Sequence, residues 1–381
     1  MRFEFLTANH VIFGAGTLKE AGKVAKEWGR KALVITGANP ARAEGLLAIL
    51  HESHISTHEL SVSGEPTVEL VVKGVKQARE WGADMVIGIG GGSAIDTAKA
   101  IAGLIPNEHP VSAYLEIVGK GLPLELPALP WIAIPTTAGT GAEVTKNAVL
   151  SVPSHKLKVS LRSVHLLAPV VLIDPELALG MPSAITAATG MDALSQLIEP
   201  YVSLRANPMT DALCGAGIVK VVGALPSACE NSNSLEARTD LALGALWSGM
   251  ALTNAGLGAV HGFASPLGGL LGAPHGVLCG AMLAPVTRGN IAALRERGLD
   301  CSRYVQVARW LTGNSAALAE DGADFLSGLA TRLGIPGLAS LGLTEELIPD
   351  VVEKSLQASS MKANPVALRP DELAAVLRAA L

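Results

Sequence analysis

Short apolar runs alternate with helical patterns through the first half of the chain. Four such runs, at residues 32–36, 84–89, 131–134 and 170–173, end at Gly, Pro or Asp, which is typical of buried strands. The second run leads through three glycines into a helical pattern from about Ser93 to Gly103. Strands that alternate with helices predict an α/β domain with a parallel sheet and helices on both faces.

The pattern changes near Pro182. From there to Leu381, segments rich in Ala, Leu and Gly have helical spacing and contain no convincing strand. A chain of 381 residues exceeds the usual size of one core. We therefore predict two domains: an α/β domain at 1–181 and an all-helical domain at 182–381.

Composition and charge argue against some classes of function. The formal net charge is −5, from 29 basic and 34 acidic residues, so no basic patch favours nucleic acid or an anionic membrane. Hydrophobic residues make up 49% of the chain, but Gly, Pro, Asp or His interrupt the apolar stretches before the roughly 20 residues of a membrane span. This apolarity predicts dense helix packing and a buried interface in a homodimer or larger homo-oligomer.

The cysteines indicate a compartment. Cys214, Cys229, Cys279 and Cys301 form no CxxC pair, so a disulfide framework is not expected. A reducing, cytoplasmic location is the simpler interpretation.

Two loops follow predicted strands and carry the residues that suit a nucleotide. Gly90, Gly91, Gly92 and Ser93 open a helix that contains Asp96, and such a helix start binds phosphate through free N–H groups. The pattern is not GxGxxG, so a plain tight turn is the alternative. The second loop, residues 135–143, has small residues and hydroxyls, and its alternative is a polar loop that caps a helix.

One carboxylate and two imidazoles lie in apolar, glycine-rich segments of the second half. Asp192, His261 and His275 form a suitable donor set for a divalent metal such as Fe²⁺ or Zn²⁺. The alternatives are a carboxylate near a helix N-terminus and two core histidines. Gln196 lies about one helical turn after Asp192 and on the same side.

Other polar residues are expected on the surface. His51, His54 and His58 fit one face at the polar end of a helix and are more often solvated than metal-binding. Lys99, Lys156 and Lys158 are likewise expected on the surface unless a ligand uses them.

These motifs, in this order and over nearly the whole chain, resemble the iron-containing (group III) alcohol dehydrogenase family. The resemblance rests on residues 90–93 with Asp96, 135–145, 190–194 and 256–262. It implies the fold that these enzymes share with dehydroquinate synthase, in which a Rossmann-like domain binds a nicotinamide dinucleotide and a helical domain holds a metal.

The resemblance also implies roles for single residues. Residues 90–93 would bind the diphosphate, and Lys158 would reach the nicotinamide ribose. Asn147 and Leu252 would line the pocket. The expected neighbours of the adenine and ribose are Thr136, Thr137 and Thr140. Asp192, His261 and His275 would be three of four metal ligands.

The chain departs from the family at two positions near the metal. Gln196 stands where the fourth ligand is usually histidine, and an amide oxygen binds Fe²⁺ or Zn²⁺ less well. Ser265 stands where the family usually has a second histidine, so a proton would leave through Ser265 and water. Three protein ligands still suffice for a catalytic metal.

The first strand is followed by Gly37 and Asn39, which are expected beside the cofactor ribose. An acidic residue at the position of Gly37 commonly selects NAD. Without it, and with Arg42 nearby, both NAD and NADP are acceptable.

The sequence thus predicts an NAD(P)-dependent dehydrogenase that acts on a small-molecule alcohol or aldehyde with a divalent metal. Asp192, His261, His275 and Ser265 would act in catalysis. A metal-independent oxo-acid reductase, like the maleylacetate reductases, is one alternative. A degraded nucleotide-binding protein is the other. The sequence leaves the substrate, the metal and the oligomeric state open.

Overall fold

A computed structural model describes residues 2–116, 118–153 and 157–381 of the chain. These residues form two compact units. The sheet unit comprises Thr7–Thr137 and Gly141–Leu179, and the helical unit comprises the residues up to Leu6, Ala138–Thr140 and Gly180–Leu381. The chain therefore passes between the units four times, after Leu6, Thr137, Thr140 and Leu179.

The sheet unit is built on six parallel strands in the order β1-β8-β5-β4-β2-β3. The strands are β1 (His10–Phe13), β2 (Lys31–Thr36), β3 (Ser56–Ser61), β4 (Met85–Gly90), β5 (Trp131–Pro135) and β8 (Val170–Ile173). The four predicted strands are β2, β4, β5 and β8, and the predicted α/β fold class is confirmed. β1 and β3 form the edges of the sheet; the apolar run of β1 is limited to residues 11–13, and polar residues interrupt that of β3.

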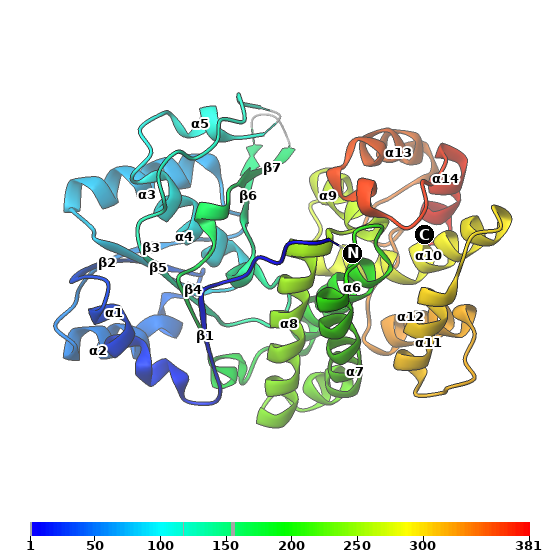
Figure 1. The fold of residues 1–381 in the computed structure, drawn as a ribbon, viewed down its shortest axis with the longest axis horizontal. Helices are drawn as coiled ribbons and strands as arrows, with labels where there is room; N and C mark the ends of the chain where they lie inside the picture. The colour runs from blue at the N-terminus through cyan, green and yellow to red at the C-terminus, as the bar shows by residue number, and fades with distance from the viewer. Residues whose placement is uncertain (1, 117, 154–156) are drawn as a thin grey trace. The chain divides into compact units, whose positions relative to one another are not determined.

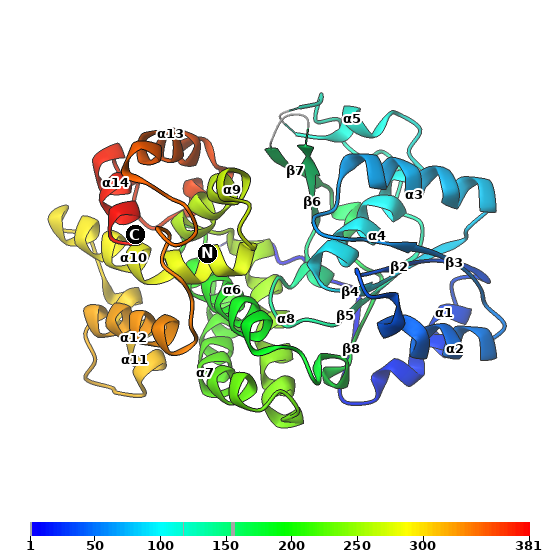
Figure 2. The same ribbon diagram turned by 180° about the vertical axis from the view of Figure 1, so that it is seen from behind.

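Helices cover both faces of this sheet (Figures 1 and 2). The helices are α1 (Ala21–Lys26), α2 (Glu44–Glu52), α3 (Val68–Trp81), α4 (Gly92–Leu104) and α5 (Val111–Tyr114). Side chains alternate along a strand, so Val34 and Ile87 pack in one cluster with Val24 of α1 and Leu46 of α2. α3 and α4 lie on the opposite face. A separate antiparallel hairpin joins β6 (Asn147–Val152) to β7 (Leu157–Arg162).

The helical unit confirms the prediction of an all-helical second half. Its helices are α6 (Ser183–Val202), α7 (Pro208–Glu230), α8 (Leu235–Ala255), α9 (Ala259–Leu271), α10 (His275–Glu296), α11 (Ser302–Thr312), α12 (Ala319–Arg332), α13 (Ile348–Gln357) and α14 (Pro370–Arg378). α6 lies at the centre of its core and is buried almost throughout from Thr186 to Val202. The Asn254 side chain in α8 accepts from the Leu6 N–H at 2.6 Å and donates to the Leu6 carbonyl at 2.8 Å.

Two helices are longer and more apolar than the sequence pattern indicated. By length and composition alone, α7 and α10 could each span a membrane. This corrects the expectation that every apolar stretch is interrupted before it is long enough for a span. Buried core helices pass the same test, and 67% of the apolar window of α10 is buried within the unit. This is weak evidence for a membrane span.

The prediction of one helical face for His51, His54 and His58 is wrong. His51 lies in α2, His54 has a φ of 58° in the turn that follows, and His58 lies in β3. Because β3 is an edge strand, it is rich in polar residues that resemble a solvated helix end. Lys156 lies outside the described residues.

Candidate functional site

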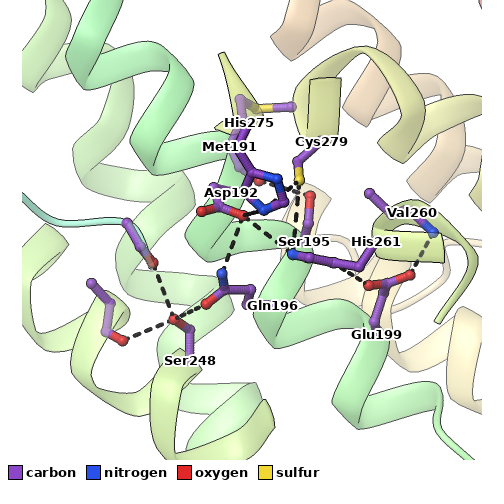
Figure 3. A network of polar contacts seen from close by, with 12 residues as sticks. Met191, Asp192, Ser195, Gln196, Glu199, Ser248, Val260, His261, His275 and Cys279 are labelled. Carbon is purple, nitrogen blue, oxygen red and sulfur yellow. Dashed lines mark hydrogen bonds and ion pairs between the residues drawn. The ribbon is translucent and has the colours of Figure 1, made fainter. Parts of the chain in front are cut away.

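Three helices of the helical unit bring the predicted metal ligands together (Figure 3). Asp192 lies on α6 and His261 on α9. His275 is the first residue of α10, and Cys279 follows one turn later on the same helix, so their side chains share a face. The single carboxylate and both imidazoles therefore meet as predicted, and a thiol joins them.

Four donor atoms converge in what we call the donor cluster: Asp192 Oδ1, His261 Nε2, His275 Nε2 and Cys279 Sγ. Asp192 Oδ1 lies 3.3 Å from His261 Nε2 and 3.6 Å from His275 Nε2. Cys279 Sγ lies 3.5 Å from His275 Nε2 and 3.8 Å from His261 Nε2. All four atoms lie within 4.8 Å of one another.

Glu199 orients His261. Its Oε2 lies 2.6 Å from His261 Nδ1, and its Oε1 accepts from the Val260 N–H at 2.6 Å. A carboxylate at Nδ1 holds the proton on that nitrogen and leaves Nε2 free as a donor toward the cluster. Glu199 lies one turn beyond Gln196 on α6. One face of α6 therefore carries both Asp192, the carboxylate of the cluster, and Glu199, which orients the His261 ring.

Gln196 does not direct its carbonyl oxygen at the cluster. Its Nε2 donates to Asp192 Oδ1 at 3.2 Å, and its Oε1 accepts from the Ser248 hydroxyl at 3.1 Å. A carboxylate oxygen only accepts hydrogen bonds, so the amide group that faces Asp192 must be the NH₂. Gln196 is therefore close to the predicted ligand position, but its donor atom points away.

The electrostatics of the cluster favour a cation. Burial raises the pKa of the Asp192 carboxyl, but the facing His275 and His261 rings lower it more, so the net pKa lies below its ordinary value. Burial opposes charge on the His261 ring, yet the Cys279 sulfur, Glu199 and Asp192 together raise the pKa of His261 well above its ordinary value. Oxygen, nitrogen and sulfur lone pairs that face one another in a buried place fit a divalent metal ion.

The backbones of α6 and α10 come close beside the cluster. A Cβ at Gly276 would lie 2.4 Å from the Ala188 carbonyl oxygen of α6. Only glycine therefore allows the start of α10, with His275, to approach the helix that carries Asp192.

The first nucleotide loop and the start of the second, residues 135–137, are neighbours in the sheet unit. The Thr136 N–H donates to the Gly90 carbonyl at 2.9 Å. α4 begins at Gly92 with Gly91 as its N-cap, so unpaired N–H groups of the first turn are available to an anion. A Cβ at Gly91 would lie 3.4 Å from Thr137 Oγ1, an ordinary contact distance, so the two loops lie side by side here. Thr140 belongs to the helical unit.

Lys99 is buried, which corrects the surface expectation. Its side chain is 0% exposed, and its Nζ donates to Asp96 Oδ1 at 3.2 Å, Thr145 Oγ1 at 2.7 Å and the Asn147 carbonyl at 2.6 Å. Asp96 Oδ2 accepts from the Val149 N–H at 3.0 Å. We call these residues, with buried Glu143, the Lys99 network. Burial raises the pKa of Glu143 to about 7.

Gly37 lies beside the first loop, because a Cβ at Gly90 would lie 3.3 Å from the Gly37 nitrogen. The Asn39 side chain accepts from the Ala41 N–H at 3.2 Å and caps the turn after Gly37. Lys158 pairs with Glu65 Oε1 at 2.9 Å. Ser265 is exposed on α9, whereas the cluster residue His261 of the same helix is buried.

Sequence reasoning missed Cys279 and Glu199. A search for CxxC pairs overlooks a cysteine that shares a helix face with a histidine four residues before it. That spacing was the available signal for Cys279. Glu199 was the next acidic residue on the face of Asp192, but nothing in the sequence tied it to His261.

Comparisons with known proteins agree over the whole chain. The family model described as iron-containing alcohol dehydrogenase matches residues 8–175, and the model of the C-terminal part of that family matches residues 186–381. Alcohol dehydrogenase 4 of Schizosaccharomyces pombe is 36% identical over 97% of this chain and 87% of its own length. The 1,3-propanediol dehydrogenase of Klebsiella pneumoniae is 34% identical over 99% of this chain and 98% of its own. A crystal structure of a 1,3-propanediol oxidoreductase superposes with a TM-score of 0.93 at 32% identity, covering 100% of both chains.

Proposed function

Because this chain belongs to the iron-containing alcohol dehydrogenase family and is an oxidoreductase acting on CH–OH groups, we propose that it uses NAD(P) and a divalent metal at the donor cluster. The substrate is a small alcohol, with the corresponding aldehyde or ketone as product. The single observation that supports the metal is the convergence of four donor atoms within 4.8 Å.

The cluster favours metal-dependent chemistry over a metal-independent oxo-acid reductase. The latter needs basic residues to hold the carboxylate of its substrate. Here the donor cluster consists of the Asp192 carboxylate, two imidazoles and the Cys279 sulfur, so its members offer lone pairs to a metal ion and include no lysine or arginine that would hold a substrate carboxylate.

The chain's own residues have distinct roles in this proposal. A divalent ion bound at the cluster supplies polarisation of the alcohol oxygen. Asp192 contributes the negative charge of the site, and Glu199 fixes the His261 ring. The His275 side chain is 35% exposed, so a small alcohol reaches the cluster from that side. Ser265 Oγ, exposed on α9, passes the substrate proton to water.

The sheet unit holds the cofactor in this proposal. The nicotinamide supplies the hydride acceptor. The start of α4, with Gly90–Ser93, binds the diphosphate through its free N–H groups, and Thr136 and Thr137 contact the ribose and adenine. Lys158 and Asn147 approach the nicotinamide end. Gly37 places no carboxylate at the ribose, so both NAD and NADP are accepted.

We further propose that residues 1–181 serve the dinucleotide and residues 182–381 the metal and substrate. The four cysteines are free thiols, which supports a reducing, cytoplasmic location. α7 is long and apolar, yet only 44% of its apolar window is buried, which supports a homo-oligomer.

The test is metal analysis of the full chain, purified anaerobically without a metal-affinity column, beside alcohol oxidation with and without chelator. We expect about one equivalent of metal, and activity that chelation removes and added metal restores. Asp192→Ala should lose the metal and at least about 1000-fold of kcat/KM, which corresponds to about 4 kcal/mol of transition-state stabilisation.

The matched control is Asp240→Ala, which removes a carboxylate that is 33% exposed and paired with Lys220 in the same unit. It should keep metal and activity. Full activity of Asp192→Ala, or chelator-resistant turnover by the wild-type protein, would overturn the metal-dependent mechanism.

A further inference from the structure

We propose that the Cys279 thiolate is the fourth protein ligand of the metal and that it makes the site prefer zinc to iron. This inference rests on the proposed metal dependence and adds the identity of one ligand and of the ion. The family resemblance implies a ligand at the position of Gln196, on α6, whereas the structure places the fourth donor on α10.

Four distances in the donor cluster lie close to those expected around one tetrahedral ion. Zinc–nitrogen and zinc–oxygen bonds of about 2.05 Å and a zinc–sulfur bond of about 2.3 Å separate N from S by about 3.5 Å and N from O by about 3.3 Å. The sulfur lies 3.5 Å from His275 Nε2 and 3.8 Å from His261 Nε2. The Asp192 oxygen lies 3.3 Å from His261 Nε2 and 3.6 Å from His275 Nε2.

Gln196 is engaged elsewhere. Its NH₂ group donates to Asp192 Oδ1, and its carbonyl oxygen accepts from Ser248. In this arrangement Gln196 supports a ligand by a hydrogen bond, as second-layer residues of metal sites commonly do. Cys279 thus supplies the fourth donor atom, which Gln196 does not.

The chemistry of the donors indicates the ion. Thiolate is a soft ligand that favours zinc, and a set of one sulfur, two imidazole nitrogens and one carboxylate oxygen is a normal zinc environment. Cys279 is fully buried, whereas the His275 side chain is 35% exposed. Four protein donors complete a tetrahedral shell, so the alcohol oxygen would bind as a fifth ligand on the exposed side beside His275, an expansion that catalytic zinc sites allow.

A second buried cysteine provides a matched control. Cys214 lies on α7 in the same hydrophobic core and is also 0% exposed, but it is not among the clustered donors. Cys214→Ser and Cys279→Ser therefore remove equally buried thiols, and only the second removes a donor.

The test replaces the metal by Co²⁺ in the full-length protein and records its absorption. The wild type and Cys214→Ser should show the near-ultraviolet charge-transfer band of a cobalt–thiolate bond, and Cys279→Ser should lack it. Zinc affinity of Cys279→Ser, measured by competition with a chelator, should fall by more than the about 10–100-fold that loss of a supporting hydrogen bond costs. Gln196→Ala should stay within that smaller range.

The ion preference is measured separately. Under anaerobic competition between Zn²⁺ and Fe²⁺, Cys279→Ser should favour zinc less than the wild type does. Circular dichroism and a Cys279→Ala variant separate ligand loss from misfolding.

The outcomes distinguish this inference from the proposed function. If the wild type binds Co²⁺ without a thiolate band, or if Gln196→Ala weakens zinc more than Cys279→Ser, the ligand assignment is overturned and metal dependence stands. If Cys279→Ser prefers zinc to iron as strongly as the wild type does, the proposal that Cys279 sets this preference is overturned. If the wild type binds neither ion, both the inference and the proposed metal dependence fail.

Discussion

The sheet unit and the helical unit each bury a group of ionisable side chains. In the Lys99 network, the Lys99 ammonium faces the Asp96 carboxylate, and backbone groups take up further hydrogen bonds on both sides. In the donor cluster, the Asp192 oxygen, two ring nitrogens and the Cys279 sulfur face one another. The first group contains its own cation. The second group offers lone pairs to a cation that must come from solution.

This difference separates a structural charge group from a chemical one. Buried charges are stable only when they are paired or bind a metal. The Lys99 network holds α4 to the segment that leads into β6 and needs nothing from outside the chain. We therefore expect mutations in the Lys99 network to affect stability and mutations in the donor cluster to affect metal content.

The largest effect on stability is expected for Lys99→Met. It leaves the Asp96 carboxylate buried without its cation, which costs about 3–5 kcal/mol of the free energy of unfolding. Urea denaturation measures the loss, and metal analysis of the folded fraction should give the wild-type content. Lys76→Met is the control, because its ion pair with Glu80 is 74% and 65% exposed and contributes about 0–1 kcal/mol. If Lys99→Met and Lys76→Met lose the same free energy of unfolding, or if Lys99→Met loses metal, the Lys99 network is not a purely structural group distinct from the donor cluster.

The protonation of Glu143 is expected to have a smaller effect on the free energy of unfolding. Burial raises its pKa from 4.5 to about 7 in the folded protein, so folding favours the protonated form. Its contribution to stability is therefore present below pH 4.5 and is lost as the pH rises to about 7. Relative to Glu143→Gln, the wild type should lose about 1–3 kcal/mol over this range. Parallel denaturation curves for the two proteins across pH 4.5–7.5 would show that Glu143 is ionised in the folded state at low pH.

The smallest effect on stability is expected for Gly37→Asp, which adds a carboxylate in an open place. A Cβ at Gly37 would meet no atom within 4 Å, so we expect a change within about 0.5 kcal/mol. The new charge should instead repel a 2′-phosphate and lower kcat/KM with NADP by at least about 10-fold relative to NAD. Steady-state kinetics with both cofactors measure this ratio. An unchanged ratio would place the ribose away from residue 37.

Buried elements were predictable where one local signal decided their structure. The central strands β2, β4, β5 and β8 are short apolar runs ended by Gly, Pro or Asp, so the run alone identified them. β1 was not predicted because its apolar run, residues 11–13, is very short, and β3 was not predicted because this edge strand carries polar residues. The polarity of Lys99 likewise indicated a surface position, and the long-range partners Thr145 and Asn147 explain its burial.

The donor cluster was predictable in part for a similar reason. Asp192, His261 and His275 stood out because polar residues are rare in their apolar surroundings. The orientation of Gln196 depends on Ser248 of α8, 52 positions away, and no sequence pattern shows that contact. Cys279 resembled an ordinary buried cysteine until α10 brought it beside two rings.

The four passages of the chain between the units have a consequence for recombination and protein engineering. A fragment that starts at Gly180 would lack Leu6, whose N–H and carbonyl both bond to Asn254, and Gly139, whose carbonyl accepts from Ser248. A single crossover between two related genes near codon 181 would therefore give a helical unit with pieces from both parents. We expect working chimaeras of this enzyme to exchange residues 1–6 and 138–140 together with the C-terminal half.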